Sequence, residues 1–254
     1  NTELMRRARQ GQIDPVMLIA ETQTAGRGRL GRNWTSRAQD SLTFSLGLML
    51  NPPDWSGLSL AVGVALAESL TQLLHAQPPH VAHPDPDRVV LVLKWPNDLW
   101  CDPGNGPHKL GGILIETATL PDPGAALAGR YAVIGVGLNL RTPEGVDSSI
   151  PPLGLQELAT GLQAPHLLRE LLPGLMRVVL DFNQQGFAPL LPRFERRDWL
   201  RDQAIRLSDG REGWARGVDA QGQLLVDTDT GRALIHSNEI RSEEHTSELQ
   251  SPDL

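Results

Sequence analysis

The chain has 254 residues, of which 40% are hydrophobic and 21% charged, a composition typical of a soluble globular protein with one large domain and a small one. The formal net charge is −7, and removing the four acidic residues that follow Arg241 leaves −3, which argues against a general nucleic-acid-binding surface. The single cysteine, Cys101, excludes a disulfide framework and an all-cysteine zinc site, and it favours a reducing compartment, the cytoplasm.

The first part of the chain alternates between strand-like and helical patterns. Asn1 or Thr2 can cap a short helix that ends near Gly11, and residues 58–75 have the apolar spacing of a longer helix. Because this segment is interrupted by polar side chains and is shorter than the roughly 20 residues of a membrane span, we expect a core helix and no membrane contact. Apolar runs predict strands at residues 16–20, 42–50, 89–95, 99–101, 113–117 and 132–136.

The last part predicts helices followed by a small β-domain. Residues 165–185 keep helical spacing with a kink or break expected at Pro173-Gly174, and a short helix follows at residues 187–197. Gly- and Asp-containing turns then separate short strands at residues 204–207, 213–218, 224–227 and 233–236, which predicts a β-barrel. We therefore expect a catalytic domain over residues 1–198, a barrel domain over residues 199–241, and a disordered, non-native tail over residues 242–254.

The densest functional pattern is the Gly/Arg loop, Ala-Gly-Arg-Gly-Arg-Leu-Gly-Arg-Asn-Trp at residues 25–34. Glycines let a backbone approach a ligand closely and arginines donate to phosphate or carboxylate oxygens, so the loop predicts an anionic ligand; the alternative is a solvated basic loop. Gly26, Gly28 and Gly31 have the spacing of a dinucleotide-binding fingerprint, but that fingerprint opens a helix, whereas this loop leads into a predicted strand. A P-loop is excluded because no Gly-Lys-Ser/Thr ends the run.

A second pattern, Lys94-Trp95-Pro96-Asn97-Asp98, has a turn composition at the end of a predicted strand. Asp98 can hold a ribose hydroxyl, a ligand amide, or Mg²⁺ through water. The alternative is a turn in which Asp98 accepts hydrogen bonds from backbone donors.

Two further patterns lie on predicted strands. In Lys-Leu-Gly-Gly-Ile-Leu-Ile-Glu at residues 109–116, Lys109 can neutralise a carboxylate that meets an α-phosphate, although a surface lysine is the commoner reading. In Val-Ile-Gly-Val-Gly-Leu-Asn-Leu at residues 133–140, Asn139 is a possible ligand contact, and the alternative is a plain core strand.

Taken in this order, the four patterns resemble the biotin protein ligase family, over roughly residues 1–240. The resemblance implies an α+β catalytic domain, with a mixed β-sheet packed with helices as in lipoyl ligases and class II aminoacyl-tRNA synthetases. It also implies that the terminal β-domain is a small SH3-like barrel.

The resemblance implies roles for individual residues as well. Biotin would contact Gln23, Gly26, Arg27 and Gly112, whereas ATP or the adenylate would contact Arg29, Arg32, Trp34, Asn97 and Asn139. Lys109, Arg29 and Asp98 would be the catalytic residues, and Asp98 would bind Mg²⁺ through water.

The implied reaction uses ATP to activate biotin as biotinyl-5′-AMP and then transfers it to a lysine of the biotin carboxyl carrier protein of acetyl-CoA carboxylase. The alternatives are a related acyl-adenylate ligase, such as a lipoate ligase, and a non-catalytic biotin-binding or repressor fragment. Asn1 matches the asparagine of the family's Ser/Thr-Thr-Asn motif, so we expect that hydroxyl residues preceding it are missing from this chain. DNA would be a partner only if an N-terminal helix-turn-helix domain existed, and a homodimer through a sheet edge is a further possibility.

Overall fold

The computed structural model describes residues 1–31, 34, 38–76, 89–104, 106–118, 129–145, 150–207 and 209–236. Arg32, an expected nucleotide contact, and the expected tail at residues 242–254 lie outside these ranges.

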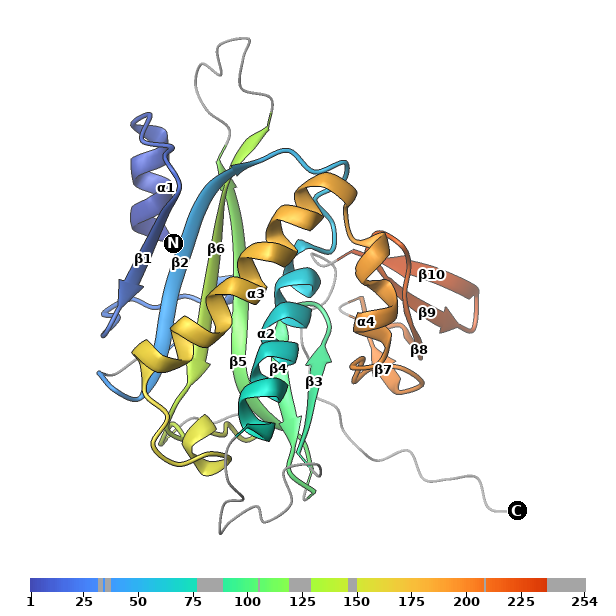
Figure 1. Cartoon of the computed structure of the whole chain (residues 1–254). Helices are drawn as coiled ribbons and strands as arrows, with labels where there is room; N and C mark the ends of the chain where they lie inside the picture. Colours follow the sequence, from blue (N-terminus) through green and yellow to red (C-terminus); the bar gives the residue numbers. More distant parts are fainter. Residues whose placement is uncertain are drawn as a thin grey trace.

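A six-stranded sheet forms the centre of the molecule, in the order β1-β2-β6-β5-β4-β3 (Figure 1). Its strands are β1 (Val16–Ala20), β2 (Ser41–Leu50), β3 (Val90–Lys94), β4 (Asp98–Asp102), β5 (His108–Ala118) and β6 (Arg130–Asn139). All its neighbouring strands are antiparallel, so the expectation of a mixed sheet is wrong. The physical reason is that β3, β4, β5 and β6 follow one another as neighbours, and a strand that folds back directly onto its predecessor pairs antiparallel.

The main sheet has an apolar face and a polar face because side chains alternate along each strand. In β2, the even-numbered residues from Leu42 to Leu50 belong to the main hydrophobic core, whereas the odd-numbered Ser41, Thr43 and Ser45 are small and polar. The helices α2 (Leu58–His75) and α3 (Ala164–Gln185) cover the apolar face (Figure 1). By length and composition α2 could cross a membrane, but 67% of it is buried inside the molecule, as expected of a core helix.

The short helix α1 (Thr2–Arg9) lies against the polar face of the sheet. Its buried residues Leu4, Met5 and Ala8 pack on Tyr131 and Val133 of β6, which point away from the main core. This small second core covers one end of the polar face and leaves the other end for the site.

Helix α3 runs without interruption from Ala164 to Gln185, so the predicted break at Pro173-Gly174 is wrong, whereas the predicted kink stays a prediction. Pro173 lies on the exposed side of the helix, where water can bind the backbone carbonyl that loses its helical partner. A Cβ added to Gly174 would lie 2.7 Å from Oγ of Ser69, so this glycine allows α3 to approach α2 closely.

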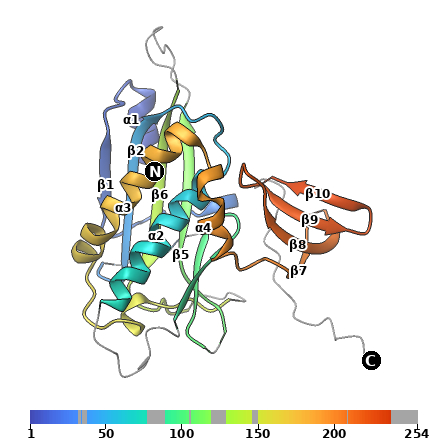
Figure 2. The same ribbon diagram turned by 45° about the vertical axis from the view of Figure 1, so that its right-hand side comes forward.

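A smaller antiparallel sheet, in the order β10-β9-β8-β7, lies beside the main one (Figure 2). Its strands are β7 (Ala204–Arg206), β8 (Glu212–Val218), β9 (Leu224–Thr228) and β10 (Gly231–Ile235). In the described part of the chain this sheet is open, with β7 and β10 as its edges, rather than a closed barrel.

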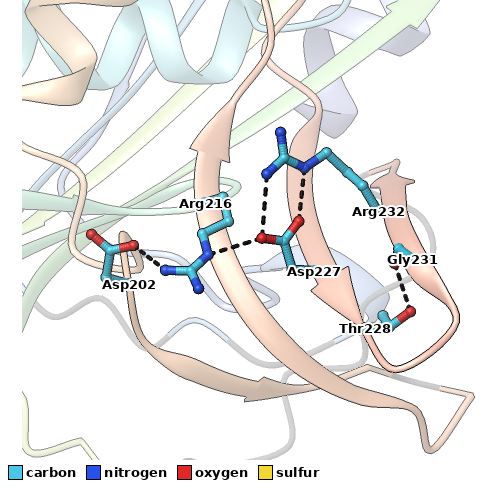
Figure 3. Close-up of polar contacts among 6 residues, drawn as sticks. All are labelled: Asp202, Arg216, Asp227, Thr228, Gly231 and Arg232. Carbon is cyan, nitrogen blue, oxygen red and sulfur yellow. Dashed lines mark hydrogen bonds and ion pairs between the residues drawn. The ribbon is translucent and has the colours of Figure 1, made fainter.

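Charged side chains form an ion-pair network on the exposed surface of this C-terminal sheet (Figure 3). Arg216 pairs with Asp202 at 2.5 Å and with Asp227 at 3.0 Å, and Arg232 also pairs with Asp227, at 2.7 Å. Exposed pairs of this kind stabilise a fold only weakly, so the network contributes mainly a nearly neutral polar surface.

The segment between the two sheets is hydrogen-bonded to the main one. The backbone nitrogen of Leu93 in β3 donates to the carbonyl of Arg197 at 2.7 Å, and the nitrogen of Trp199 donates to the carbonyl of Leu93 at 3.0 Å. The helix α4 (Leu191–Glu195) precedes this segment. The predicted domain boundary after residue 198 therefore falls within a segment whose backbone is hydrogen-bonded to β3.

Candidate functional site

The polar face of the main sheet carries a floor of small residues across neighbouring strands. Thr43 of β2 lies beside Gly137 of β6, Gly137 lies beside Gly112 of β5, and Gly112 lies beside Asp98 of β4. Residues without a bulky side chain allow a ligand to approach the backbone closely. We call these four residues the floor.

A β-bulge brings Lys109 to the edge of this floor. Leu99 pairs with Gly111 and Trp100 pairs with Lys109, so Leu110 is an extra residue in β5. A bulge redirects the side chains that follow it. Leu110 is fully buried in the main core, and Lys109 reaches the polar face, where its Nζ lies 2.8 Å from Oδ2 of Asp98.

Three charged groups meet at this end of the floor. The side chains of Lys109 and Asp98 are 31% and 18% exposed, so water screens their attraction only in part. Burial lowers the pKa of Arg29 from its usual value, and the nearby Asp98 carboxylate opposes that effect. An arginine remains protonated under such conditions, so two cations and one carboxylate leave an excess of positive charge for an anionic ligand.

Trp34 lies on the floor. A Cβ added to Gly137 would be only 2.6 Å from Cε2 of the indole, and one added to Gly112 would be 3.9 Å from Cζ3. The indole nitrogen is buried and has no hydrogen-bond partner among the described residues. The structure therefore places Trp34 directly above the two glycines and beside the charged groups.

The Gly/Arg loop closes on itself and is attached to the rest of the site. The backbone nitrogen of Trp34 donates to the carbonyl of Gly26 at 2.9 Å, and a Cβ at Gly26 would collide with the backbone of Trp34. Arg27 donates to Oγ1 of Thr2 at 2.9 Å and forms an ion pair of 3.4 Å with Glu116. Gly26 is thus needed for closure, and Arg27 ties the loop to α1 and β5.

The two expected asparagines both bind the backbone of β5. Asn97 donates through Nδ2 to the backbone carbonyl of Ile113 at 2.9 Å. The backbone carbonyl of Asn97 in turn accepts a hydrogen bond of 2.9 Å from the backbone nitrogen of Ile113. Asn139 is 5% exposed and donates to the carbonyl of Lys109 at 3.3 Å. Both residues therefore hold the strand that carries the lysine.

Asn1 and a glutamine complete the described site. The hydroxyl of Ser45 donates to Oδ1 of Asn1 at 2.8 Å. The amide of Asn1 also donates to the carbonyl of Leu114 at 3.1 Å. Gln23 lies beside Gly26, and its buried Oε1 has no partner within the described ranges, which makes it a candidate acceptor for a ligand N–H.

A cavity of about 580 Å³ adjoins the Gly/Arg loop. Its walls include Arg27, Arg29 and Glu116, the start of α2, and Gly222 and His236 of the C-terminal region. Lys109 and Asp98 are not among its lining residues, whereas Arg29 lines it and interacts with Asp98. The site thus consists of the charged floor and a neighbouring cavity, with Arg29 between them.

The sequence interpretation did not identify Ser45 or Glu116. Ser45 belongs to a pattern that alternates small polar residues with large apolar ones over residues 41–48, and this pattern indicates a strand with one polar face. Glu116 has no comparable local pattern, because its partner Arg27 lies 89 residues away.

Comparisons with known proteins agree with these motifs. A family model described as the biotin/lipoate A/B protein ligase family matches residues 7–139, just over half of the chain. The biotin--[acetyl-CoA-carboxylase] ligase of Mycobacterium tuberculosis is 35% identical over 249 residues, which cover 93% of this chain and 82% of that protein. The chain belongs to the biotin/lipoate A/B protein ligase family.

Other relatives match the chain over different shares of their length. The bifunctional ligase/repressor BirA of Escherichia coli is 35% identical over 219 residues, which cover 83% of this family member but 61% of BirA. The structure of a biotin protein ligase from Aquifex aeolicus in complex with biotin and ATP has a TM-score of 0.65 and 24% identity, and the match covers 88% of this chain and 86% of that one. The latter similarity establishes the shared α+β fold.

Proposed function

We propose that this family member is a biotin protein ligase, which uses ATP to activate biotin and transfers it to a lysine of a carrier protein. The observation that carries the proposal is the ion pair between Lys109 and Asp98 at the end of a glycine floor, with Arg29 next to it. This arrangement provides positive charge where two anions have to approach each other. The names of the M. tuberculosis and E. coli relatives support the same activity.

In the first step, a carboxylate oxygen of biotin attacks the α-phosphorus of ATP, and the bond to the β-phosphate breaks to release pyrophosphate. Lys109 and Arg29 offset the charge of the incoming carboxylate and of the phosphate oxygens, which lowers the repulsion between them. In the second step, a lysine amine of the acceptor attacks the activated carbonyl carbon, and AMP leaves. The protein supplies positioning and charge rather than a nucleophile of its own.

The proposed substrate contacts follow the motifs. Gln23, Gly26, Arg27 and Gly112 form the biotin side of the site, whereas Arg29, Trp34, Asn97 and Asn139 form the nucleotide side. Arg32 remains a proposed nucleotide contact. The cavity beside Arg27 and Arg29 has the size of a small-molecule site, and it is lined by one residue from each proposed side.

The residues present fit Mg²⁺ held mainly by the phosphates of ATP. Mg²⁺ commonly uses one or two carboxylates together with phosphate oxygens and waters, and the described residues include no cluster of three metal-binding side chains. Asp98 would hold the ion through water, since its Oδ2 is paired with Lys109. When bound, Mg²⁺ neutralises phosphate charge.

A lipoate ligase is the second candidate, because the family model covers both activities. The acceptor proposed here is the biotin carboxyl carrier protein of acetyl-CoA carboxylase, in line with the name of the M. tuberculosis relative. A homodimer and an SH3-like closure of the C-terminal sheet belong to the same proposal, and DNA would be a partner only of a parent protein that has a helix-turn-helix domain.

The deciding experiment is pyrophosphate exchange into ATP, measured with biotin, with lipoate and with neither. Exchange that depends on biotin supports the proposal. Exchange with lipoate alone replaces it by the second candidate, and no exchange with either acid leaves a non-catalytic binding protein, which calorimetry with biotin would detect.

A further inference from the structure

The turn that precedes Asp98 is in direct contact with the C-terminal sheet. Trp95, the first residue of the turn between β3 and β4, is 3% exposed. Its Nε1 donates a buried hydrogen bond of 2.9 Å to the carbonyl of Gly222, which lies 127 residues later in the turn between β8 and β9. A side chain of the Lys-Trp-Pro-Asn-Asp motif is therefore held by a different sheet from the one that carries the motif.

The turn at residues 219–223 is built to present this carbonyl. Oδ1 of Asp219 accepts hydrogen bonds from the backbone nitrogens of Gln221 and Gln223, at 2.9 and 2.8 Å. Gly222 has a φ of +82°, and a Cβ added there would lie 2.8 Å from Cα of Gly57, which precedes α2. Glycine is required at residue 222 by both its backbone angle and this close approach, so the position of its carbonyl is well defined.

The turn between β3 and β4, which begins with Trp95, is attached at its other end to β5 and to the floor. The reciprocal hydrogen bonds between Asn97 and Ile113 hold residue 97 against β5, and the next residue, Asp98, pairs with Lys109. Only Pro96 separates Trp95 from Asn97. A displacement of the Trp95 side chain is therefore transmitted through a short, constrained piece of backbone to the carboxylate of Asp98.

We propose that Trp95 is a positioning residue through which the 219–223 turn of the C-terminal sheet sets the placement of Asp98 and Lys109. The inference rests on the proposed function as far as catalysis is concerned. Trp95 does not touch the reacting atoms; it acts through Asn97 and Asp98. The C-terminal sheet thereby contributes to activation of the acid without placing a charged side chain on the floor.

The test compares Trp95→Phe with Trp100→Phe in the full chain. Both residues are buried tryptophans, at 3% and 2% exposure, but Nε1 of Trp100 has no hydrogen-bond partner among the described residues. The two variants thus remove the same atoms, and only Trp95→Phe removes a hydrogen bond. We expect Trp95→Phe to lower kcat of biotin-dependent pyrophosphate exchange about tenfold, because misplacement of catalytic groups by about 1 Å has effects of this order or larger. KM for biotin should change less than about threefold. Trp100 lies opposite Lys109 in the ladder, so Trp100→Phe is the control for stability and for hydrogen exchange at Ile113, not for kcat.

Two further measurements separate positioning from general loss of stability. Asp219→Ala loosens the 219–223 turn without changing Trp95. If both residues act through the same contact, the loss of kcat in the double variant should be smaller than the product of the two single losses. Hydrogen exchange of the Ile113 amide, which donates to Asn97, should become about tenfold faster in Trp95→Phe and stay unchanged in Trp100→Phe.

An unchanged kcat in Trp95→Phe, multiplicative losses in the double variant, or unchanged exchange at Ile113 would each overturn the inference. The exchange measurement needs no activity. If the unmodified protein showed no biotin-dependent pyrophosphate exchange, the proposed function would fail, and the Ile113 amide would still decide whether Trp95 positions the turn.

Discussion

Gly137→Ala probes the contact between Trp34 and the floor. The new Cβ would lie 2.6, 2.7 and 3.0 Å from Cε2, Cζ2 and Nε1 of the indole, closer than Cβ atoms approach other heavy atoms in proteins. Because β6 is paired with β2 and β5 on its two sides, the strand is held and the indole has to move. A displacement of about 1 Å restores ordinary van der Waals separation.

Overpacking of this size destabilises a protein by about 1–3 kcal/mol. We therefore expect Gly137→Ala to lower the free energy of unfolding by about that amount, and to lower kcat/KM for ATP by about 10- to 100-fold if Trp34 packs against the nucleotide. Gly112→Ala is the matched stability control, since Gly112 lies directly beside Gly137 in the ladder. A Cβ there would be no closer than 3.5 Å to a neighbour, an ordinary contact, so the free energy of unfolding should change by less than about 0.5 kcal/mol.

Urea unfolding of the original protein, Gly137→Ala, Trp34→Ala and the double variant measures the contact directly. In the Trp34→Ala background the indole is gone, so Gly137→Ala should cost less than about 0.5 kcal/mol. An equal cost of Gly137→Ala in both backgrounds would refute the placement of Trp34 on the floor.

Three other perturbations test charged residues, two of them in the site and one in the segment that follows α4. Lys109→Met should lower biotin-dependent pyrophosphate exchange about 10²- to 10³-fold while calorimetry still detects biotin binding, and a loss below tenfold would contradict its assigned role. Arg29→Gly should release activated biotin and label bystander lysines, visible as additional bands on a biotin blot; an unchanged blot would count against the Gly/Arg loop as a cover. Burial raises the pKa of Asp198 from 3.8 to about 6, so the folded state binds the proton more tightly and loses stability as the pH rises from about 4 to 6. Asp198→Asn should therefore increase the free energy of unfolding by about 1–3 kcal/mol at pH 8 and have little effect at pH 3.5, as urea titrations at the two values would show.

Local sequence patterns predicted most of the elements. The strand at residues 16–20 and the helix at residues 58–75 match β1 and α2, because continuous apolar runs and helical spacing are local properties that tertiary contacts reinforce. The structure brings Lys109, Asp98 and Arg29, which come from three of the four motifs, together. The assignment of individual contacts to biotin and to nucleotide stays a prediction.

The remaining features depend on contacts that no local pattern encodes. Pro173 predicted a break in α3, yet its exposed position lets the helix continue. The extra residue Leu110, which places Lys109 on the polar face, follows from the register between β4 and β5 and cannot be read from the apolar pattern of β5 alone. The hydrogen bond from Trp95 to Gly222 likewise requires the C-terminal sheet to be in place.

The single cysteine of the chain lies outside the site, which agrees with a reaction that uses no cysteine nucleophile. Burial raises the pKa of the single cysteine, Cys101, to about 12, and its side chain lies in the main core rather than on the polar face. A thiolate is therefore absent near neutral pH, and Cys101 cannot accept an acyl group. The site instead offers the glycine backbone and the Asp98 carboxylate of the floor, together with the cations Lys109 and Arg29 beside it. With Lys109 paired to Asp98 and Arg29 beside them, these charged groups can hold two anions at reacting distance. An activated acid that stays bound non-covalently then has to be covered until an acceptor amine arrives, and the closed Gly/Arg loop, tied to β5 through Arg27 and Glu116, is placed to do so.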